Sequence, residues 1–171
     1  DPLAKYPVDD PSVEVSPDDI ACITFTSGSS GTPKGVLGRH IALTLFANWT
    51  QTKFGINEHD RFSMLSGLAH DPLQRDIFTP LQVGASLSIP DPKEIGTHGW
   101  LARWMKQEGI SVTNLTPAMG QMLTGSSDEE LLSLRRAFFV GDMLTRRDVA
   151  RLKKLAPVGT SVNLYGTTET Q

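Results

Sequence analysis

The chain has 171 residues, enough for one domain with a buried hydrophobic core. Hydrophobic residues make up 39% of it and charged residues 20%, as in an ordinary globular protein. The net charge of −3 gives no basis for a nucleic-acid or membrane-surface partner, and a single cysteine excludes an internal disulfide. There is no apolar run of membrane-spanning length and no signal peptide at the acidic N-terminus, so we expect a cytoplasmic protein without a membrane or nucleic-acid partner.

Residues 1–19 differ in composition from the rest of the chain. They contain four prolines and six acidic residues against a single lysine. Such a segment has too little apolar surface to pack, so we expect an extended connector.

From residue 20 to residue 171, short apolar runs alternate with amphipathic ones. Strands are expected at 20–26, 61–65, 85–89, 110–115, 136–140 and 160–165. Helices are expected at about 39–54, 72–82, 98–108, 117–124 and 145–155. This alternation predicts an α/β fold, a mostly parallel β-sheet flanked by helices, and such sheets bind ligands beyond the carboxyl ends of their strands.

Three of these elements are expected to contribute to the core. The strand at 20–26 is apolar and places Cys22 in the interior. The helix at 39–54 has an apolar stripe, and so does the helix at 98–108, which Gly109 should end. The two stripes are Ile41, Ala42, Leu45, Phe46 and Trp49, and Trp100, Leu101, Trp104 and Met105.

A glycine- and hydroxyl-rich loop follows the first predicted strand. Glycines let a backbone approach a polyanion, while N–H groups, hydroxyls and one lysine can bind phosphate oxygens. The loop is not a Walker A sequence, because Pro33 and Gly35 stand where that pattern needs glycine and Ser or Thr. A flexible surface loop is the alternative. The candidate phosphate ligands are Thr26, Ser27, Gly28, Ser29, Ser30, Gly31, Thr32 and Lys34.

A second motif, from Asn163 to Thr170, follows the last predicted strand. Alone, Tyr165-Gly166-Thr167-Thr168-Glu169-Thr170 could be a polar turn that closes a strand. Together with Thr-Ser-Gly-Ser-Ser-Gly-Thr-Pro-Lys-Gly at 26–35, it resembles the adenylate-forming superfamily, which includes acyl-CoA synthetases and the adenylation domains of nonribosomal peptide synthetases. The order and the separation of the two motifs match that superfamily over nearly all of residues 20–171.

The resemblance implies that the chain binds ATP and Mg²⁺ and activates a carboxylate as an acyl-adenylate. Lys34, Thr168 and Glu169 match the catalytic positions, with Thr168 at the α-phosphate and Glu169 on the metal. The remaining nucleotide contacts are expected from Gly141, Asp142, Asn163, Tyr165, Gly166 and Thr167, with Tyr165 stacked on adenine and Asn163 bonded to its amino group.

The segment from His70 to Phe78 stands where amino-acid-activating members bind their substrate. Asp71 matches the aspartate that pairs with a substrate ammonium group. It could also cap the helix that starts at Pro72, and Arg75, four residues on, could be its intrahelical partner. Arg75 departs from the bulky apolar residue of many relatives, and a guanidinium suits a carboxylate. An ammonium site beside a carboxylate site describes the head of an α-amino acid, which leaves a distal carboxylate for ATP.

In this respect the chain resembles the adenylation domains of fungal α-aminoadipate reductases. These enzymes adenylate the δ-carboxylate of L-2-aminoadipate, load it onto a phosphopantetheine carrier and reduce the thioester with NADPH in lysine biosynthesis. The resemblance places His70, Asp71, Arg75, Asn114, Phe138, Val140 and Leu164 around the substrate, although Phe138 and Val140 could equally be core.

The family's C-terminal lysine, its ribose-binding aspartate and its hinge have no counterpart among these residues. We therefore expect a partial adenylation domain that is inactive alone, with carrier and reductase domains in cis. Two alternatives stay open: another amino-acid-activating or acyl-CoA-forming ligase, and a non-catalytic nucleotide-binding module.

Overall fold

The computed structural model describes residues 4–26, 31–68, 70–125 and 129–170. A five-stranded, wholly parallel sheet has the strand order β4-β3-β5-β6-β7. Its strands are β3 (Arg61–Ser63), β4 (Ser86–Ser88), β5 (Val112–Leu115), β6 (Arg136–Phe139) and β7 (Thr160–Asn163). The expected α/β fold with a mostly parallel sheet is confirmed.

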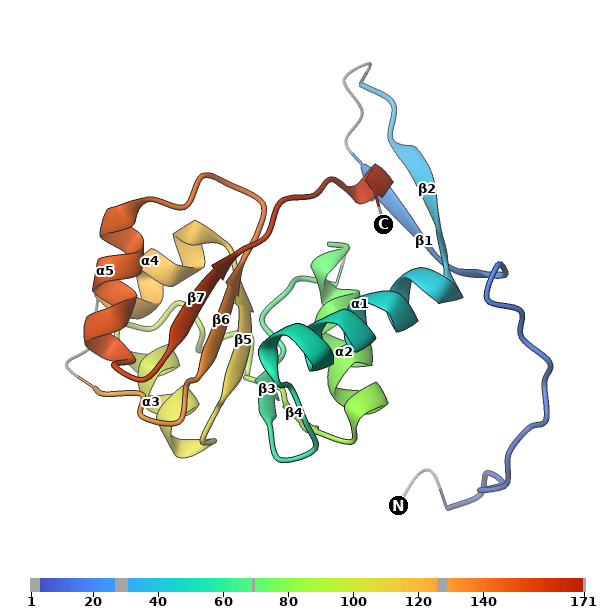
Figure 1. The fold of residues 1–171 in the computed structure, drawn as a ribbon, viewed down its shortest axis with the longest axis horizontal. Coiled ribbons are helices and arrows are strands. Elements are labelled where there is room, and N and C mark those ends of the chain that lie inside the picture. The colour runs from blue at the N-terminus through green and yellow to red at the C-terminus, as the bar shows by residue number, and fades with distance from the viewer. Residues whose placement is uncertain (1–3, 27–30, 69, 126–128, 171) are drawn as a thin grey trace.

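Helices cover both faces of this sheet, as parallel strands joined by helical crossovers require (Figure 1). One face carries α3 (Trp100–Gln107), α4 (Pro117–Gly125) and α5 (Arg146–Leu155), and the other carries α1 (His40–Phe54) and α2 (Pro72–Val83). The side chains of β6 alternate between the two layers: Phe139 packs with α3, α4 and α5, whereas Phe138 packs with Ile56, Phe62 and Val112.

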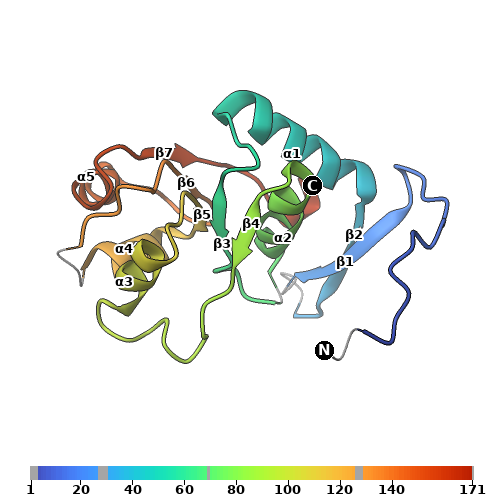
Figure 2. The same ribbon diagram turned by 90° about the horizontal axis from the view of Figure 1, so that it is seen from below.

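The first strand does not join the parallel sheet. β1 (Ile20–Thr26) pairs antiparallel with β2 (Lys34–Arg39), a strand that the sequence reading missed, and the hairpin projects from the body of the molecule (Figures 1 and 2). Ile23 and Phe25 are 58% and 67% exposed, and Cys22 is only half-buried. The expectation of a buried strand was wrong, because an apolar run of this length does not reveal whether both of its faces are covered.

The two helix stripes have different outcomes. On α3, Leu101 and Met105 are buried and both tryptophans pack against the same core, as expected. On α1 the buried residues are Ala47 and Thr50, while Leu45 is 59% and Trp49 43% exposed. The α1 stripe is therefore not core: Ala42, Leu45, Phe46 and Trp49 line a cavity described below, and Ile41 is exposed.

A buried ion pair fastens the amino ends of the parallel strands. Asp60, before β3, accepts hydrogen bonds from Arg135 Nε at 2.7 Å, Ser111 Oγ at 2.6 Å and the Asn57 N–H at 2.9 Å. Arg135 also bonds to the Gly55 carbonyl at 2.8 Å. Burial alone would raise the pKa of Asp60, but the bonds from Arg135, Ser111 and Asn57 outweigh it and hold the pKa below its ordinary value.

None of the helices in the described part of the chain combines the length and the apolar character that a membrane crossing needs.

Asp60→Ala should lower the free energy of unfolding by about 3 kcal/mol, because it leaves Arg135 without its buried partner. Since the folded-state pKa of Asp60 is lowered, this contribution is present above pH 4 or so and lost as the pH falls through the lowered pKa. Urea unfolding of the chain at pH 7 and near pH 3 measures both effects.

Asp18→Ala is the matched control, because it breaks the exposed Asp18–Arg39 pair, whose side chains are 76% and 62% exposed. A loss for Asp60→Ala no larger than that of the control would contradict the prediction.

Candidate functional site: three adjoining cavities at the carboxyl ends of the strands

Two cavities open where the strands β5, β6 and β7 end, and a third adjoins them between α1 and α2. The first, of about 320 Å³, lies between the turn after β6 and the segment after β7. Its lining includes Gly141, Asp142, Asn163, Tyr165 and Gly166, all expected at the nucleotide. Gly141 has a φ of +94°, which a side chain would strain. The Tyr165 side chain is 99% exposed, so its ring is open for stacking.

The candidate phosphate loop connects β1 to β2 in the sequence. Ser27, Gly28, Ser29 and Ser30 lie outside the described residues. On either side of them, Thr26 ends β1 and pairs with Lys34, which begins β2, while Gly31 has a φ of +80° and Thr32 is exposed. The described residues on either side of the loop thus belong to two antiparallel strands of a hairpin, not to a strand and a helix.

The C-terminal segment leaves β7 and crosses toward the hairpin (Figure 1). It ends in a short 3₁₀ turn, Thr168–Thr170, in which Glu169 is exposed. Within the described residues there is no cluster of three metal-binding side chains. A lone exposed carboxylate still fits Mg²⁺, which proteins often hold through one or two carboxylates together with substrate phosphates.

A second cavity, of about 350 Å³, adjoins the first through Gly141. It is lined by the expected substrate residues His70, Asp71, Asn114 and Val140, together with Thr116 and neighbouring apolar side chains. Thr168 Oγ1 donates to Asp71 Oδ1 at 3.4 Å, so the expected α-phosphate ligand meets the expected ammonium ligand.

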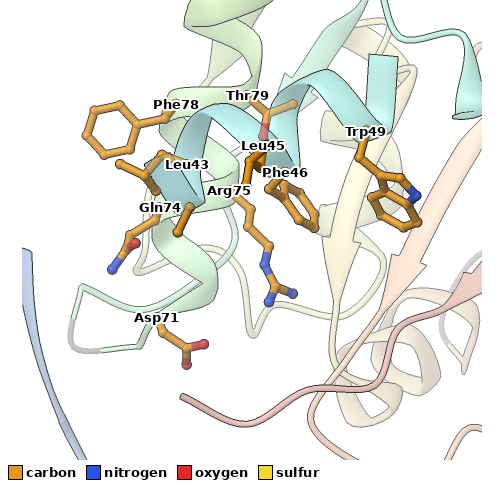
Figure 3. A pocket seen from close by; sticks show the side chains of 10 residues that line it. Leu43, Leu45, Phe46, Trp49, Asp71, Gln74, Arg75, Phe78 and Thr79 are labelled. Carbon is orange, nitrogen blue, oxygen red and sulfur yellow. The ribbon is translucent and has the colours of Figure 1, made fainter. Parts of the chain in front are cut away.

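A third cavity, also about 350 Å³, lies between α1 and α2 and shares Asp71 with the second (Figure 3). Both Asp71 and Arg75 line it, and Figure 3 shows the two side chains pointing to the same end. The other lining residues are Ala42, Leu43, Leu45, Phe46, Trp49, Gln74, Phe78 and Thr79.

Arg75 is a half-buried cation, and one of its nitrogens has no hydrogen-bond partner. Its Nη1 is inaccessible and without a hydrogen-bond partner, and within the described residues no carboxylate lies within ion-pair distance of it. Burial lowers the pKa of Arg75, and the charges of Asp71 and Asp76 oppose that change. A buried donor of this kind is costly unless a ligand satisfies it.

Asp71 does not cap α2. It occupies the position before Pro72 with helical φ and ψ, and its side chain makes no capping hydrogen bond. The expectation of a cap was wrong, because a cap needs extended backbone at that residue. The intrahelical ion pair with Arg75 is also absent from the salt bridges of the described residues.

The remaining substrate residues are divided between the cavities and the core. Leu164 lines the first cavity, while Phe138 is 3% exposed and contacts only a small hollow of about 10 Å³ beneath α1. Asn114 lines that hollow and the second cavity.

Asp76 joins the segments around the second cavity, and the sequence reading did not single it out. It has no exposed surface, and its Oδ1 accepts from Asn114 Nδ2 at 2.8 Å. Its Oδ2 accepts from the backbone N–H groups of Leu65 at 3.2 Å and Ser66 at 3.0 Å. Burial raises the pKa of Asp76 despite these bonds. The sequence signal that could have identified Asp76 is a carboxylate on the inner side of an amphipathic helix.

Comparison with known proteins identifies the family. A profile described as AMP-binding enzyme matches residues 2–171. The chain is 57% identical over 159 residues to the L-2-aminoadipate reductase large subunit of Eremothecium gossypii and 55% identical to the L-2-aminoadipate reductase of Saccharomyces cerevisiae, covering 93% of this chain in both. It spans only 12% and 11% of those relatives. The resemblance drawn from the two motifs is confirmed.

Solved structures agree on the fold. The nonribosomal peptide synthetase FmoA3 matches 90% of this chain and 16% of its own, with a TM-score of 0.82 at 30% identity. The Vibrio cholerae adenylation domain AlmE, solved in complex with glycyl-adenosine-5'-phosphate, matches 90% of this chain and 29% of its own, with a TM-score of 0.81 at 26% identity.

Asp76→Asn should lower the free energy of unfolding by about 2–3 kcal/mol, because an amide oxygen cannot accept from both Asn114 and the Leu65–Ser66 backbone, while its NH₂ group faces a donor. Thermal or urea unfolding of the chain measures this. Asp91→Asn, in an exposed turn, is the control. Equal stability of the two variants would show that the carboxylate of Asp76 does not fix these segments.

Proposed function

This chain belongs to the AMP-binding enzyme family, whose members use ATP, and on that premise we propose that it activates the distal carboxylate of a dicarboxylic amino acid, L-2-aminoadipate, as its adenylate. The observation that carries the substrate class is Arg75, a half-buried guanidinium with one unpaired nitrogen, whose side chain lines a cavity together with Asp71. The names of the reductases that are 55–57% identical agree with that substrate.

The amino-acid head is proposed to lie between Arg75 and Asp71. The guanidinium would bind the α-carboxylate through two N–H groups, and the Asp71 carboxylate would accept from the α-ammonium. Because Arg75 and Asp71 carry opposite charges, the pair would discriminate against a monocarboxylic acid and against a diacid that lacks an amino group. The distal carboxylate would then extend away from Arg75.

The shared walls of the cavities support that direction. Asp71 lines both the third and the second cavity, and Gly141 lines both the second and the first. A substrate held at Arg75 therefore has a path through the second cavity toward the proposed nucleotide site at Asn163 and Tyr165. Val140 and Asn114 would contact its methylene chain.

The chemistry asks the protein for positioning and charge neutralisation. An oxygen of the already ionised carboxylate would attack the α-phosphorus of ATP, and pyrophosphate would leave. Mg²⁺, when bound through Glu169 and the phosphates, would offset their negative charge. The loop at 26–34, with Lys34, would bind the β- and γ-phosphates, and Thr168 would bond to the α-phosphate.

We further propose that residues 20–171 are part of a larger adenylation domain, with residues 1–19 as its connector. Phosphopantetheine and NADPH would serve carrier and reductase domains in the same polypeptide, as the length of the reductases allows. A cytoplasmic location stays a prediction from the sequence.

In the full-length enzyme, Glu169→Ala should reduce ATP–pyrophosphate exchange by on the order of 10²-fold, because the metal loses its protein ligand. Lys34→Ala should cause a smaller loss, since it acts on the phosphates that leave. Glu94→Ala is the control, because Glu94 is an exposed carboxylate that lines none of the three cavities. Exchange at the control level after Glu169→Ala would remove Glu169 from the site.

Arg75→Leu and Asp71→Asn should each change the discrimination between aminoadipate and a different analogue. 5-Aminopentanoate lacks the α-carboxylate of aminoadipate, and adipate lacks the α-amino group. Arg75→Leu should lower kcat/KM for aminoadipate, with a loss of transition-state stabilisation of about 2–5 kcal/mol, and leave kcat/KM for 5-aminopentanoate nearly unaffected. Asp71→Asn should abolish the preference over adipate instead.

Melting temperatures and KM for ATP show whether each variant is folded and binds nucleotide. Unchanged aminoadipate kinetics in folded Arg75→Leu would reject the substrate assignment. A panel of other amino and fatty acids, assayed by the same exchange reaction, would identify a different acid as the substrate.

A further inference from the structure

The Arg75 guanidinium is held by an aromatic ring rather than by a carboxylate. Its Cζ lies 4.8 Å from the centroid of the Phe46 ring, on α1 (Figure 3). The carboxylate of Asp76, which is buried and whose charge acts on Arg75, has both oxygens occupied by Asn114, Leu65 and Ser66. Phe46 thus supplies the direct contact to this cation, from a helix that the sequence reading treated as core.

The kind of contact matters for what Arg75 can bind. A ring face attracts a cation through its quadrupole and covers one flat side of the guanidinium. It leaves the N–H edges in the guanidinium plane and does not cancel the charge. A carboxylate in the same place would occupy those edges, and an incoming ligand carboxylate would have to displace it.

The Phe46 ring is itself part of a row of aromatic contacts. Its centroid is 5.7 Å from that of Trp49, Trp49 is 5.1 Å from Phe54, and Phe54 is 5.0 Å from Phe138 on β6. The last two pairs are edge-on, a favoured aromatic geometry. This row links the position of the Phe46 ring to the sheet, and only a small hollow of about 10 Å³ remains beneath it.

We propose that Phe46 is the positioning residue for Arg75 and thereby sets the preference for a substrate that carries a carboxylate at that end of the cavity. The proposal rests on the proposed function, because it gives Arg75 the α-carboxylate of an amino acid as its ligand. Phe46 does not touch the reacting atoms, and it acts by holding the cation in one plane.

The test is Phe46→Leu in the full-length enzyme, assayed by ATP–pyrophosphate exchange with L-2-aminoadipate and with 5-aminopentanoate. Leucine keeps an apolar side chain and removes the ring face. The ratio of the two kcat/KM values should fall by about 3- to 30-fold, the range of a cation–π contact from partly exposed to desolvated. Discrimination against adipate and KM for ATP, which a general structural defect would change, should stay within about twofold of wild type.

Three further single variants and one double variant complete the experiment. Phe46→Tyr retains the ring face and should retain the ratio, whereas Phe46→Met, a flexible filler of similar bulk, should lose it even where Phe46→Leu lowers the melting temperature. Ile41→Ala, on the same helix but outside the cavity lining, is the matched control. In an Arg75→Leu background, Phe46→Leu should have no further effect on the ratio.

The outcomes separate this inference from the proposed function. If Arg75→Leu collapses the ratio and both Phe46→Leu and Phe46→Met leave it within twofold, Phe46 does not position Arg75 and the inference is overturned alone. If Arg75→Leu also leaves the ratio unchanged, the proposed substrate contact fails and the inference falls with it.

Discussion

Asp76 has no exposed surface, yet its carboxylate accepts hydrogen bonds from two segments of chain besides its own helix: the backbone after β3 at Leu65 and Ser66, and Asn114 on β5. Both segments line the middle cavity, and α2, which carries Asp76, also carries Asp71 and Arg75. The relative position of helix and strand ends therefore depends on one buried anion. Its burial is costly, and the three donors offset that cost.

The parallel sheet explains why residues far apart in sequence reach the same place. The carboxyl ends of β5, β6 and β7 lie at one edge, so Asn114, Gly141 and Asn163 line adjoining cavities although about 50 residues separate the first and last of them. The hairpin β1–β2, whose strands flank the proposed phosphate loop, is a separate two-stranded sheet, so its register is independent of that of the parallel strands.

The sequence predicted the parallel strands, the five helices and the two motifs because each leaves a local pattern. It predicted β1 at its observed bounds but expected it to be buried. It missed β2, because Lys34–Arg39 contains two glycines and two cations and has little apolar character to mark a strand. It took the α1 stripe for core, since helical periodicity identifies an apolar face and not what covers it. Its alternative interpretation of Asp71 as a helix cap came from the position before Pro72, and the helical backbone of Asp71, which rules out the cap, could not be predicted from that position. Contacts such as Phe46 with Arg75, across two helices, leave no pattern along the chain.

Two arginines of this chain show how burial separates structural from functional charge. Arg135 donates hydrogen bonds to Asp60 and to the backbone carbonyls of Phe54 and Gly55, so its charge is paired within the fold. Arg75 is half-buried among aromatic and apolar side chains, has an inaccessible nitrogen without a hydrogen-bond partner, and lines a cavity. Desolvation lowers the pKa of Arg75, yet a guanidinium stays charged in proteins, so the cost of burying it is not relieved by loss of a proton. In the proposed site, an anion that satisfies Arg75 would remove this cost, and Asp71 at the same end of the cavity would favour an anion that also carries a positive charge.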